Sequence, residues 1–484
     1  MTRLSLSTCK TLPYDPAFVD IGIVHLGVGA FHRAHQADYT DAVLAKGDKR
    51  WAILGASLRA PDTRDALKDQ DWLYTLAQSD EQGERCRVIA ALRGVLVAPE
   101  NPQALIEAMC LPSVKIVSLT VTEKGYCHDP ATGALNDQHP DILHDLGHPD
   151  TPRSAPSFLV EAIRARKARG LPPFTVLCCD NLPANGRTVA KVVTRLAALR
   201  SPDLGQYVAE HIAFPATMVD RIVPATTDAD RARITKATGL EDQWPVVTEA
   251  FTDWVIEDNF PQGRPDWAAR FVTDIAPFET MKLRLLNGAH SSMSYLGYLA
   301  GHETIADCMK DESLAHFVSH LMNMEVTSTL AVPPGTDVSA YKQALLTRFR
   351  NPGLRHRTWQ IAMDGSQKLP QRLLGTIRDR LKAGAPIEAL ALGVAAWMRY
   401  VTGVDEKGGA IELRDPLKDE LRAKTDAAGL DAARIASALL SIKKIFGSDL
   451  PADPRFTTAV TAALDSLIRH GSQQTYENFR STHP

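Results

Sequence analysis

The first half of the chain alternates short apolar runs with amphipathic stretches. The apolar runs have the character of strands buried on both faces of a sheet, and they cover residues 21–26, 51–56, 88–92, 114–121, 174–179 and 218–223. An amphipathic stretch over residues 34–45 separates the first two runs. Apolar strands separated by helices predict βαβ units, and therefore an α/β fold with a mainly parallel sheet.

The pattern changes near residue 275. From there the apolar positions recur with helical spacing, and Pro-Gly pairs interrupt the helical segments. The predicted helices cover residues 280–300, 312–324, 338–349, 370–382, 387–401, 432–445 and 456–470. The sequence thus predicts a mainly parallel α/β domain over residues 1–275 and a mostly α-helical domain over residues 276–484.

Composition and charge narrow the class of protein. The chain has 484 residues, 44% of them hydrophobic, with 54 Lys and Arg against 57 Asp and Glu. This length suits two or three domains, and the composition excludes a mostly disordered or collagen-like chain. A net charge of −3 argues against a large nucleic-acid interface, which needs a basic excess or a basic stripe.

The cysteines and the apolar segments indicate in which cellular compartment the protein works. Seven scattered cysteines without a C-x-x-C pair do not form a disulfide framework and favour a reducing environment. The N-terminus lacks the apolar core of a signal peptide, and the longest strongly apolar stretch, residues 389–398, is about half of what spans a bilayer. We expect a cytoplasmic protein that does not enter the membrane, and at this size an enzyme.

A glycine turn follows the first predicted strand. Gly27 and Gly29 are placed as in a dinucleotide-binding fold, where glycines let the backbone approach a pyrophosphate. His32 stands where the third glycine of that motif is expected, and the next acidic residue after the second strand, Asp62, comes late. An ordinary turn between strand and helix explains the two glycines equally well.

The two histidines of the following stretch suggest a metal pair. His32 and His35 share one face of a helix, but no cysteine stands nearby in the sequence to complete a site. A structural or phosphate-facing role is therefore favoured, and we expect no metal in the functional site.

The segment from residue 279 to residue 290 carries the most chemical information. On an α-helix, Glu279, Lys282, Asn287 and His290 fall within an arc of roughly 140°. Leucines share that arc, so the polar groups lie in a partly apolar wall, where they should pair or perform chemistry. The alternative is a Glu–Lys surface pair beside a core helix.

A second polar residue lies at the end of a predicted strand. Asn181 follows the strand over residues 174–179, and ligands of open α/β sheets bind beyond the carboxyl ends of strands. A lysine can protonate a nascent alkoxide, and two amide side chains can stabilise its charge. Lys282, Asn181 and Asn287 together predict a metal-free site that reduces a carbonyl group.

Several motifs in the same order resemble the long-chain polyol dehydrogenases, the family of the mannitol 2-dehydrogenases and the fructuronate (mannonate) reductases. The motifs lie at residues 25–35, 117–126, 179–181 and 214–224, and at Lys282-x4-Asn287-x2-His290. The resemblance covers nearly the whole chain. It implies a Rossmann-type N-terminal domain, a helical substrate-binding domain, NAD as cofactor and no zinc.

The resemblance also implies roles for individual residues. Lys282 would be the general acid/base, Asn181 and Asn287 the oxyanion pair, and Glu279 a proton relay, while His290 and Lys368 would hold substrate hydroxyls. Asp62 would read the adenosine ribose, which favours NAD over NADP. The residues expected to bind the cofactor are Gly27, Gly29, Phe31, His32, Asp62, Glu123 and Asp220.

The choice of substrate within the family depends on arginines. Arg284 and the segment over residues 354–368 look more like the fructuronate reductases, and Arg284, Arg355 or Arg357 could bind a sugar-acid carboxylate. The same arginines could instead pair with acidic side chains. We therefore expect a keto-sugar acid as substrate, with mannitol or a related polyol as the alternative.

Two further expectations concern the protein as a whole. A non-catalytic NAD-binding regulator on the same scaffold is a distant alternative, because such a protein would be expected to lose the catalytic groups that this chain keeps. We expect a monomer or a weak oligomer, with a small molecule and no nucleic acid as its partner.

Overall fold

A computed structural model describes residues 2–80, 82–129 and 132–484. The chain divides into two compact units, Met1–Ala276 and Pro277–Pro484, which we call unit 1 and unit 2.

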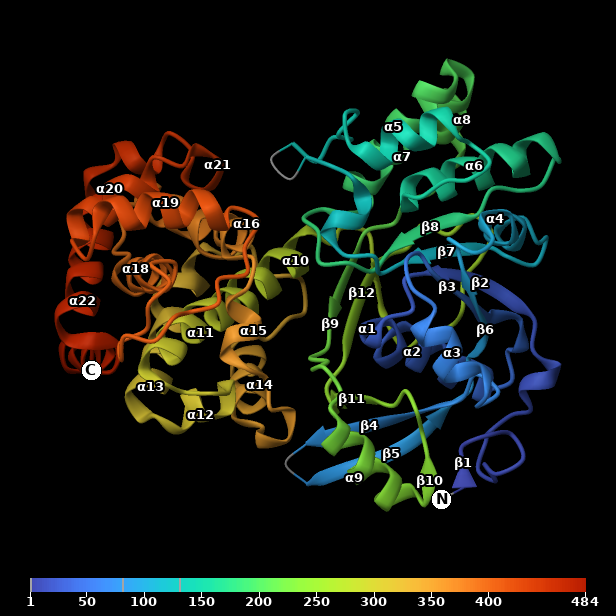
Figure 1. The fold of residues 1–484 in the computed structure, drawn as a ribbon, viewed down its shortest axis with the longest axis horizontal. Coiled ribbons are helices and arrows are strands. Elements are labelled where there is room, and N and C mark those ends of the chain that lie inside the picture. Colours follow the sequence, from blue (N-terminus) through green and yellow to red (C-terminus); the bar gives the residue numbers. More distant parts are fainter. Residues whose placement is uncertain (1, 81, 130–131) are drawn as a thin grey trace. The chain divides into compact units, whose positions relative to one another are not determined.

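Unit 1 contains a five-stranded parallel sheet in the order β6-β3-β2-β7-β8 (Figure 1). Its strands are β2 (Ile21–Leu26), β3 (Ala52–Ser57), β6 (Leu92–Val97), β7 (Ile116–Leu119) and β8 (Thr175–Cys178). Counted along the chain within this sheet, the order is 3-2-1-4-5, as in the doubly wound dinucleotide-binding folds. The predicted fold class is therefore confirmed.

Helices cover both faces of this sheet because successive side chains of its strands point to opposite faces. Val24 of β2 packs with Phe158 of α6 and Val193 of α7, whereas the preceding Ile23 packs with Val43 of α2. The helices of unit 1 are α1 (Ala30–Ala34), α2 (Gln36–Ala45), α3 (Asp62–Lys68), α4 (Pro102–Met109), α5 (Pro140–Gly147), α6 (Ala155–Ala168), α7 (Asn185–Arg200), α8 (Pro202–His211) and α9 (Asp228–Thr238).

Smaller sheets flank the main one, and they correct two of the predicted strands. The strand predicted over 88–92 is wrong, because β5 ends at Ile89 and β6 begins at Leu92. The strand predicted over 218–223 is β9 (Thr217–Asp220), which pairs antiparallel with β12 outside the parallel sheet. The strands of the flanking sheets are β1 (Thr2–Arg3), β4 (Tyr74–Asp80), β5 (Gly83–Ile89), β9, β10 (Leu240–Glu241), β11 (Val246–Glu249), β12 (Asp253–Glu257) and β13 (Arg270–Val272).

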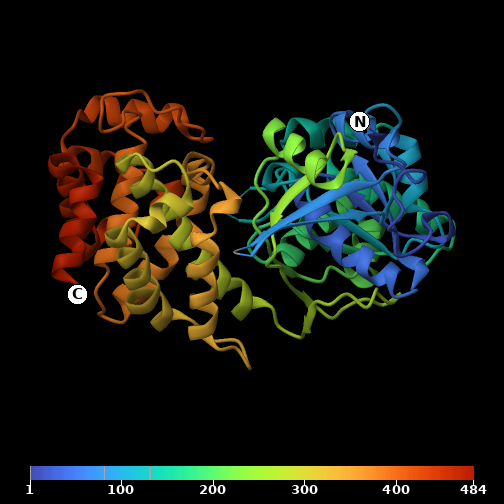
Figure 2. The same cartoon turned by 90° about the horizontal axis from the view of Figure 1, so that it is seen from below.

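Unit 2 is built from helices (Figure 2). They are α10 (Ala276–Lys282, which starts on the last residue of unit 1), α11 (Ala289–Ala300), α12 (Ile305–Lys310), α13 (Glu312–His320), α14 (Val338–Arg350), α15 (Thr358–Ala362), α16 (Gly365–Leu369), α17 (Gly375–Lys382), α18 (Glu388–Tyr400), α19 (Lys418–Ala428), α20 (Ala432–Leu440), α21 (Lys443–Phe446) and α22 (Pro454–Thr482). Every residue of α18 from Ala389 to Tyr400 is buried, so the long apolar stretch of the sequence forms the centre of the unit 2 core. None of the described helices combines the length and apolar character needed to cross a bilayer.

Three π-helical turns interrupt the helices of unit 2. They are η4 (Leu283–Gly288), η5 (Leu321–Val326) and η8 (Pro370–Leu374). The helix predicted over 280–300 is therefore α10, η4 and α11 in succession rather than a uniform α-helix. In a π turn each backbone hydrogen bond joins residues five apart in the sequence. The arc of roughly 140° predicted for Glu279, Lys282, Asn287 and His290 on a uniform α-helix therefore does not describe this segment.

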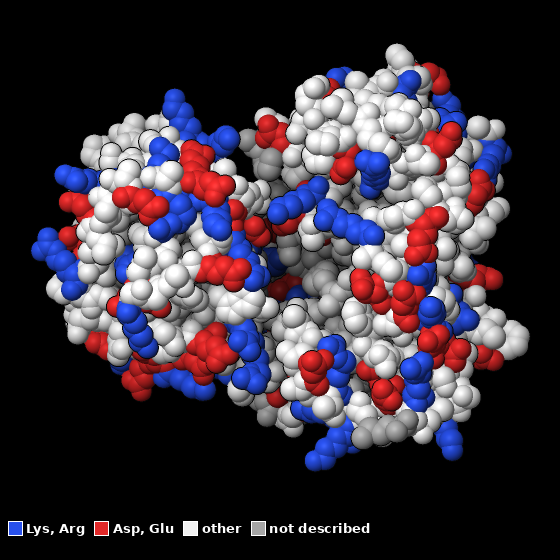
Figure 3. All heavy atoms as spheres, in the orientation of Figure 1, with Lys and Arg blue, Asp and Glu red and all other residues white. Residues whose placement is uncertain are grey.

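Charged side chains of both signs intermingle over the face shown in Figure 3. This distribution agrees with the near-balanced counts of acidic and basic residues.

Candidate active site

The backbone of the glycine turn in unit 1 requires a glycine at its first position, Gly27. Gly27 has φ of 95°, and a Cβ at this position would lie 2.1 Å from the carbonyl oxygen of Thr120. A Cβ at Gly29 would meet no heavy atom within 4 Å, and α1 begins at the next residue. The turn is thus locked at Gly27 and open at Gly29, as close approach of a phosphate requires.

A cavity of about 930 Å³ lies beside this turn at the carboxyl ends of the parallel strands. Gly27, Gly29 and Asp62 line it, together with the cations Arg59 and Lys124. Exposed backbone and cations suit a pyrophosphate, and a carboxylate suits ribose hydroxyls, so these residues fit a dinucleotide. Sequence reasoning missed both cations, although Lys124 stands inside one of the quoted motifs.

The other predicted cofactor residues, Phe31, His32, Glu123 and Asp220, are not among the described lining residues of this cavity. His32 is buried and stacks on His25, with ring centroids 3.4 Å apart. Burial, and then the neighbouring His25, lower the pKa of His32 well below its ordinary value, so the ring is neutral. Its place in the core supports the structural role rather than contact with phosphate.

Glu123 and Asp220 lie in different environments. Glu123 is exposed at the start of the 3-10 helix η3 (Glu123–Tyr126), whereas Asp220 is buried at the end of β9. Phe31 lies on α1 and stacks on His35, with ring centroids 5.1 Å apart. Contact of any of these residues with a cofactor stays a prediction.

Asp180 ties together the carboxyl ends of the neighbouring strands β7 and β8. Its carboxylate accepts hydrogen bonds from the backbone N–H groups of Val121 (2.9 Å) and Thr122 (3.1 Å) and from the hydroxyl of Tyr126 (2.6 Å). Burial raises the pKa of Asp180 to about 6. These bonds fix the loop after β7 beside the chain that carries Asn181, an exposed residue of unit 1.

Unit 2 brings Glu279, Lys282, Asn287 and His290 onto one continuous helical path. Lys282 is the last residue of α10, Asn287 lies in η4, and His290 is the second residue of α11. Lys282 and His290 are buried. π turns inside α-helices occur frequently at functional sites, and this one separates the predicted acid/base from its predicted companions.

Gly288 lets η4 pack closely against η8. A Cβ at Gly288 would lie 2.9 Å from the carbonyl oxygen of Arg372. The small residue beside Asn287 therefore admits another backbone. This contact places Arg372 beside the α11 segment, where its Nη1 donates a hydrogen bond to Ser291 Oγ at 3.0 Å.

His290 lies at the centre of a cationic region. Its ring centroid is 4.4 Å from that of Phe349 and 5.4 Å from that of His356. Burial lowers the pKa of His290 well below its ordinary value, and His356, Arg348, Arg372 and Lys282 lower it further. A neutral imidazole in this place can exchange hydrogen bonds with a hydroxyl group.

The same region holds polar atoms that the fold leaves unsatisfied. Asn287 Oδ1, His290 Nε2 and His356 Nδ1 are buried and find no hydrogen-bond partner among the described residues. Buried polar atoms are normally hydrogen-bonded, so this group is suited to a polar ligand. Lys368 lies close by, since after burial it is the charge that lowers the pKa of His356 to about 4.

Lys368 donates to the carbonyl oxygens of Met363 (2.6 Å) and Ile361 (3.3 Å). These bonds tie α16 to the end of α15.

The arginines predicted to bind a carboxylate have other surroundings. Arg284 forms an ion pair with Asp379 at 2.6 Å, and Arg357 forms one with Glu303 at 2.9 Å. Arg355 is exposed. Sequence reasoning missed Arg348 and Arg372, because they come from α14 and η8 and no local motif connects them to His290.

Two models of known protein domains match this chain. Residues 21–269 match the model of the mannitol dehydrogenase Rossmann domain, and residues 274–468 match that of the mannitol dehydrogenase C-terminal domain. The chain belongs to the mannitol dehydrogenase family. It is an oxidoreductase of this family, as the sequence predicted.

Individual relatives cover almost the whole chain. The D-mannonate oxidoreductase of Escherichia coli (strain K12) is 47% identical over 95% of this chain and 96% of its own length. The mannitol 2-dehydrogenase of Aspergillus terreus is 40% identical over 95% of this chain and 93% of its own. The mannitol 2-dehydrogenase of Pseudomonas fluorescens, solved with NAD and D-mannitol, matches with a TM-score of 0.93 and 38% identity over 99% of this chain and 100% of its own.

Proposed function

We propose that this protein is an NAD-dependent oxidoreductase that interconverts fructuronate, a keto-sugar acid, and its aldonate, mannonate. The proposal that the cofactor is NAD rests on two observations. They are the cavity lined by Gly27, Gly29 and Asp62 and the NAD bound in the solved relative. The bound dinucleotide would supply the hydride for carbonyl reduction.

The residues of the chain would supply the proton and the stabilisation of charge. Lys282 would give a proton to the carbonyl oxygen as the carbonyl is reduced and would take it back in the reverse direction. Asn181 and Asn287 would donate hydrogen bonds to the same oxygen. His290, kept neutral by burial, and Lys368 would hold substrate hydroxyl groups.

The cationic surroundings of His290 are the observation that carries the choice of a sugar acid. Arg348, Arg372 and Lys282 act on one buried imidazole, and Lys368 acts on the neighbouring His356. Arginine binds carboxylates through charge-assisted hydrogen bonds, whereas an uncharged polyol gains little from so many cations. The 47% identity to a D-mannonate oxidoreductase, against 40% for mannitol 2-dehydrogenases, points the same way.

The test is NADH oxidation with fructuronate and fructose side by side. The two substrates differ at one carbon, which is a carboxylate in the first and a hydroxymethyl group in the second. We expect a much higher kcat/KM for fructuronate. A higher kcat/KM for fructose would assign the protein to mannitol and fructose, and NADH binding without turnover of either substrate or of a panel of related polyols would favour the non-catalytic regulator.

A further inference from the structure

Three side chains with metal-binding atoms converge in unit 1. Cys127 follows η3, and His139 and Asp141 flank the first residue of α5. The Cys127 sulfur, a His139 ring nitrogen and an Asp141 carboxylate oxygen all lie within 4.8 Å of one another. We call these three residues the Cys127 cluster.

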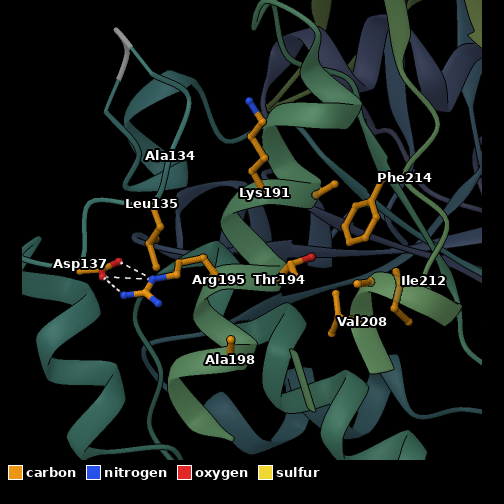
Figure 4. A pocket seen from close by; sticks show the side chains of 12 residues that line it. Ala134, Leu135, Asp137, Lys191, Thr194, Arg195, Ala198, Val208, Ile212 and Phe214 are labelled. Carbon is orange, nitrogen blue, oxygen red and sulfur yellow. Dashed lines mark hydrogen bonds and ion pairs between the residues drawn. The ribbon is translucent and has the colours of Figure 1, made fainter. Parts of the chain in front are cut away.

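The backbone holds this cluster together. Asn136 N donates to the carbonyl oxygen of Cys127 at 2.9 Å, and His139 N donates to that of Asn136 at 2.9 Å. Asp137, two residues before His139, is ion-paired with Arg195 of α7 at 2.5 Å (Figure 4). The segment that carries His139 is therefore fastened both to Cys127 and to a neighbouring helix.

The backbone conformation of Cys127 also indicates that the surrounding structure fixes its position. Its φ of 51° and ψ of 36° are in the left-handed region, which residues other than glycine seldom adopt. Such a conformation persists only where the surroundings fix it, and functional sites collect such residues. The thiol is buried and belongs to no disulfide.

We propose that the Cys127 cluster binds one thiophilic divalent cation of the zinc class, with Cys127, His139 and Asp141 as ligands and a fourth position open to solvent. Sulfur, imidazole nitrogen and carboxylate oxygen are the ligand types that zinc accepts. Zinc–ligand bonds of about 2.0–2.3 Å place tetrahedral ligand atoms about 3.3–3.8 Å apart. The ligand atoms would draw together around the ion by rotation of side chains, which His139 and Asp141 can do because both are partly exposed.

Binding would release the thiol proton of Cys127 to solvent, because the thiolate is the ligand. The neighbouring Asp145 stays outside the ligand set. Its carboxylate already accepts hydrogen bonds from Arg153 N, Ser154 N and Ser154 Oγ.

The position of the cluster connects it to the proposed dinucleotide site. Cys127 and Asp141 line the same cavity as Gly27 and Asp62. A cation there would share the cavity with the dinucleotide, so that each changes the affinity for the other by the same factor.

Titration of the full-length protein with Co²⁺ alone tests the site. We expect one equivalent to bind with a near-ultraviolet thiolate-to-cobalt charge-transfer band. Cys127→Ser should abolish the band. His139→Gln and Asp141→Asn should weaken Co²⁺ binding at least about tenfold, because even the loss of a hydrogen-bond partner of a metal ligand costs that much. Cys86→Ser is the matched control, because Cys86 is a partly exposed free thiol on β5.

Absence of the band in the wild-type protein, or its persistence in Cys127→Ser, would overturn the proposal. Should Cys127→Ser fail to fold, wild-type affinity in the His139→Gln variant would overturn it equally, since His139 is partly exposed. Circular dichroism of each variant checks the fold.

A second titration at saturating NADH tests the shared cavity. We expect the Co²⁺ affinity to change several-fold, and an unchanged affinity would contradict the coupling. This second measurement rests on the proposed function. Failure of NADH to bind would count against the proposed function, but it would not change what the first titration shows about Co²⁺ binding.

Discussion

Lys282 is the residue on which the proposed chemistry depends, and its place in the fold is unusual. It ends α10 immediately before the π turn, and it is buried. A lysine in such a place is costly to keep unless it pairs or reacts. The spacing to Asn287 and His290 could be read from the sequence, because all three stand within nine residues.

Replacing Lys282 by alanine should remove most of the turnover. General acid/base catalysis contributes about 10²–10⁴-fold, so we expect kcat to fall by that factor while NADH binding, measured by fluorescence titration, is retained. Lys310→Ala is the control, because Lys310 is an exposed lysine of unit 2 paired with Asp307. Turnover at the wild-type rate in Lys282→Ala would refute the mechanism.

The cations around His290 mark the limit of what could be predicted from the sequence at the residue scale. Arg284 and Arg357 were predicted because they stand inside or beside recognisable motifs, and the structure pairs them with Asp379 and Glu303. Arg348 and Arg372 approach His290 only through tertiary packing. A contact of that kind leaves no spacing in the sequence from which it could be predicted.

At the scale of elements, the packing of η4 on η8 sets the geometry of the site. Gly288→Ala places a Cβ 2.9 Å from the carbonyl oxygen of Arg372, and a backbone oxygen cannot rotate away. We expect a loss of about 1–3 kcal/mol in the free energy of unfolding, measured by thermal denaturation, and a reduced kcat.

Gly375→Ala is the matched control for this contact. Gly375 follows η8 directly, and a Cβ there would meet its nearest neighbours at 3.8 Å, an ordinary contact. We expect its stability to stay within about 1 kcal/mol of the wild type. Equal stability of the Gly288 and Gly375 variants would show that the close approach does not matter.

A buried carboxyl group joins η5 to the start of α18. Glu325 accepts hydrogen bonds from the N–H groups of Ala389 (2.8 Å) and Leu390 (2.9 Å), and burial raises its pKa from 4.5 to about 7. Between these values the folded protein holds a proton that the unfolded chain has lost. The contribution of this group to stability therefore falls as pH rises from about 4.5 to about 7.

Glu325→Gln should remove this pH dependence. Glutamine keeps an acceptor of similar shape but does not titrate. We expect the Tm of the wild type, measured by calorimetry, to fall relative to the variant over that pH interval, by the equivalent of at most about 3 kcal/mol. Parallel Tm profiles of the two proteins would contradict the raised pKa.

The elements that the sequence predicted well are those with a strong apolar pattern. Residues 22–26 of β2 and 389–400 of α18 are buried without a break, so that their apolar runs stand out in the sequence. The hairpin β4–β5 was missed because β5 turns polar side chains to solvent. The π turns were missed because the helical spacing of apolar residues does not distinguish a short i to i+5 turn from the α-helix on either side of it.

For the whole molecule, two units divide the proposed work. Unit 1 carries the glycine turn, the cavity and Asn181, and unit 2 carries Lys282, Asn287 and the cations around His290. The net charge of −3 gives no hint of this cationic region, because acidic side chains elsewhere balance it. The central claim is that these cations select a substrate with a carboxylate.

The most direct test of that claim is the ratio of kcat/KM for fructuronate to kcat/KM for fructose, compared between the wild type and Arg372→Met. A charge-assisted hydrogen bond contributes about 1.5–3 kcal/mol, so we expect the ratio to fall about tenfold to a hundredfold. Arg378→Met is the control, because Arg378 is ion-paired with Asp449 at 2.6 Å. We predict a wild-type ratio above one, a lower ratio in Arg372→Met and an unchanged ratio in Arg378→Met. A ratio that Arg372→Met leaves unchanged would contradict the selection of a carboxylate by these cations.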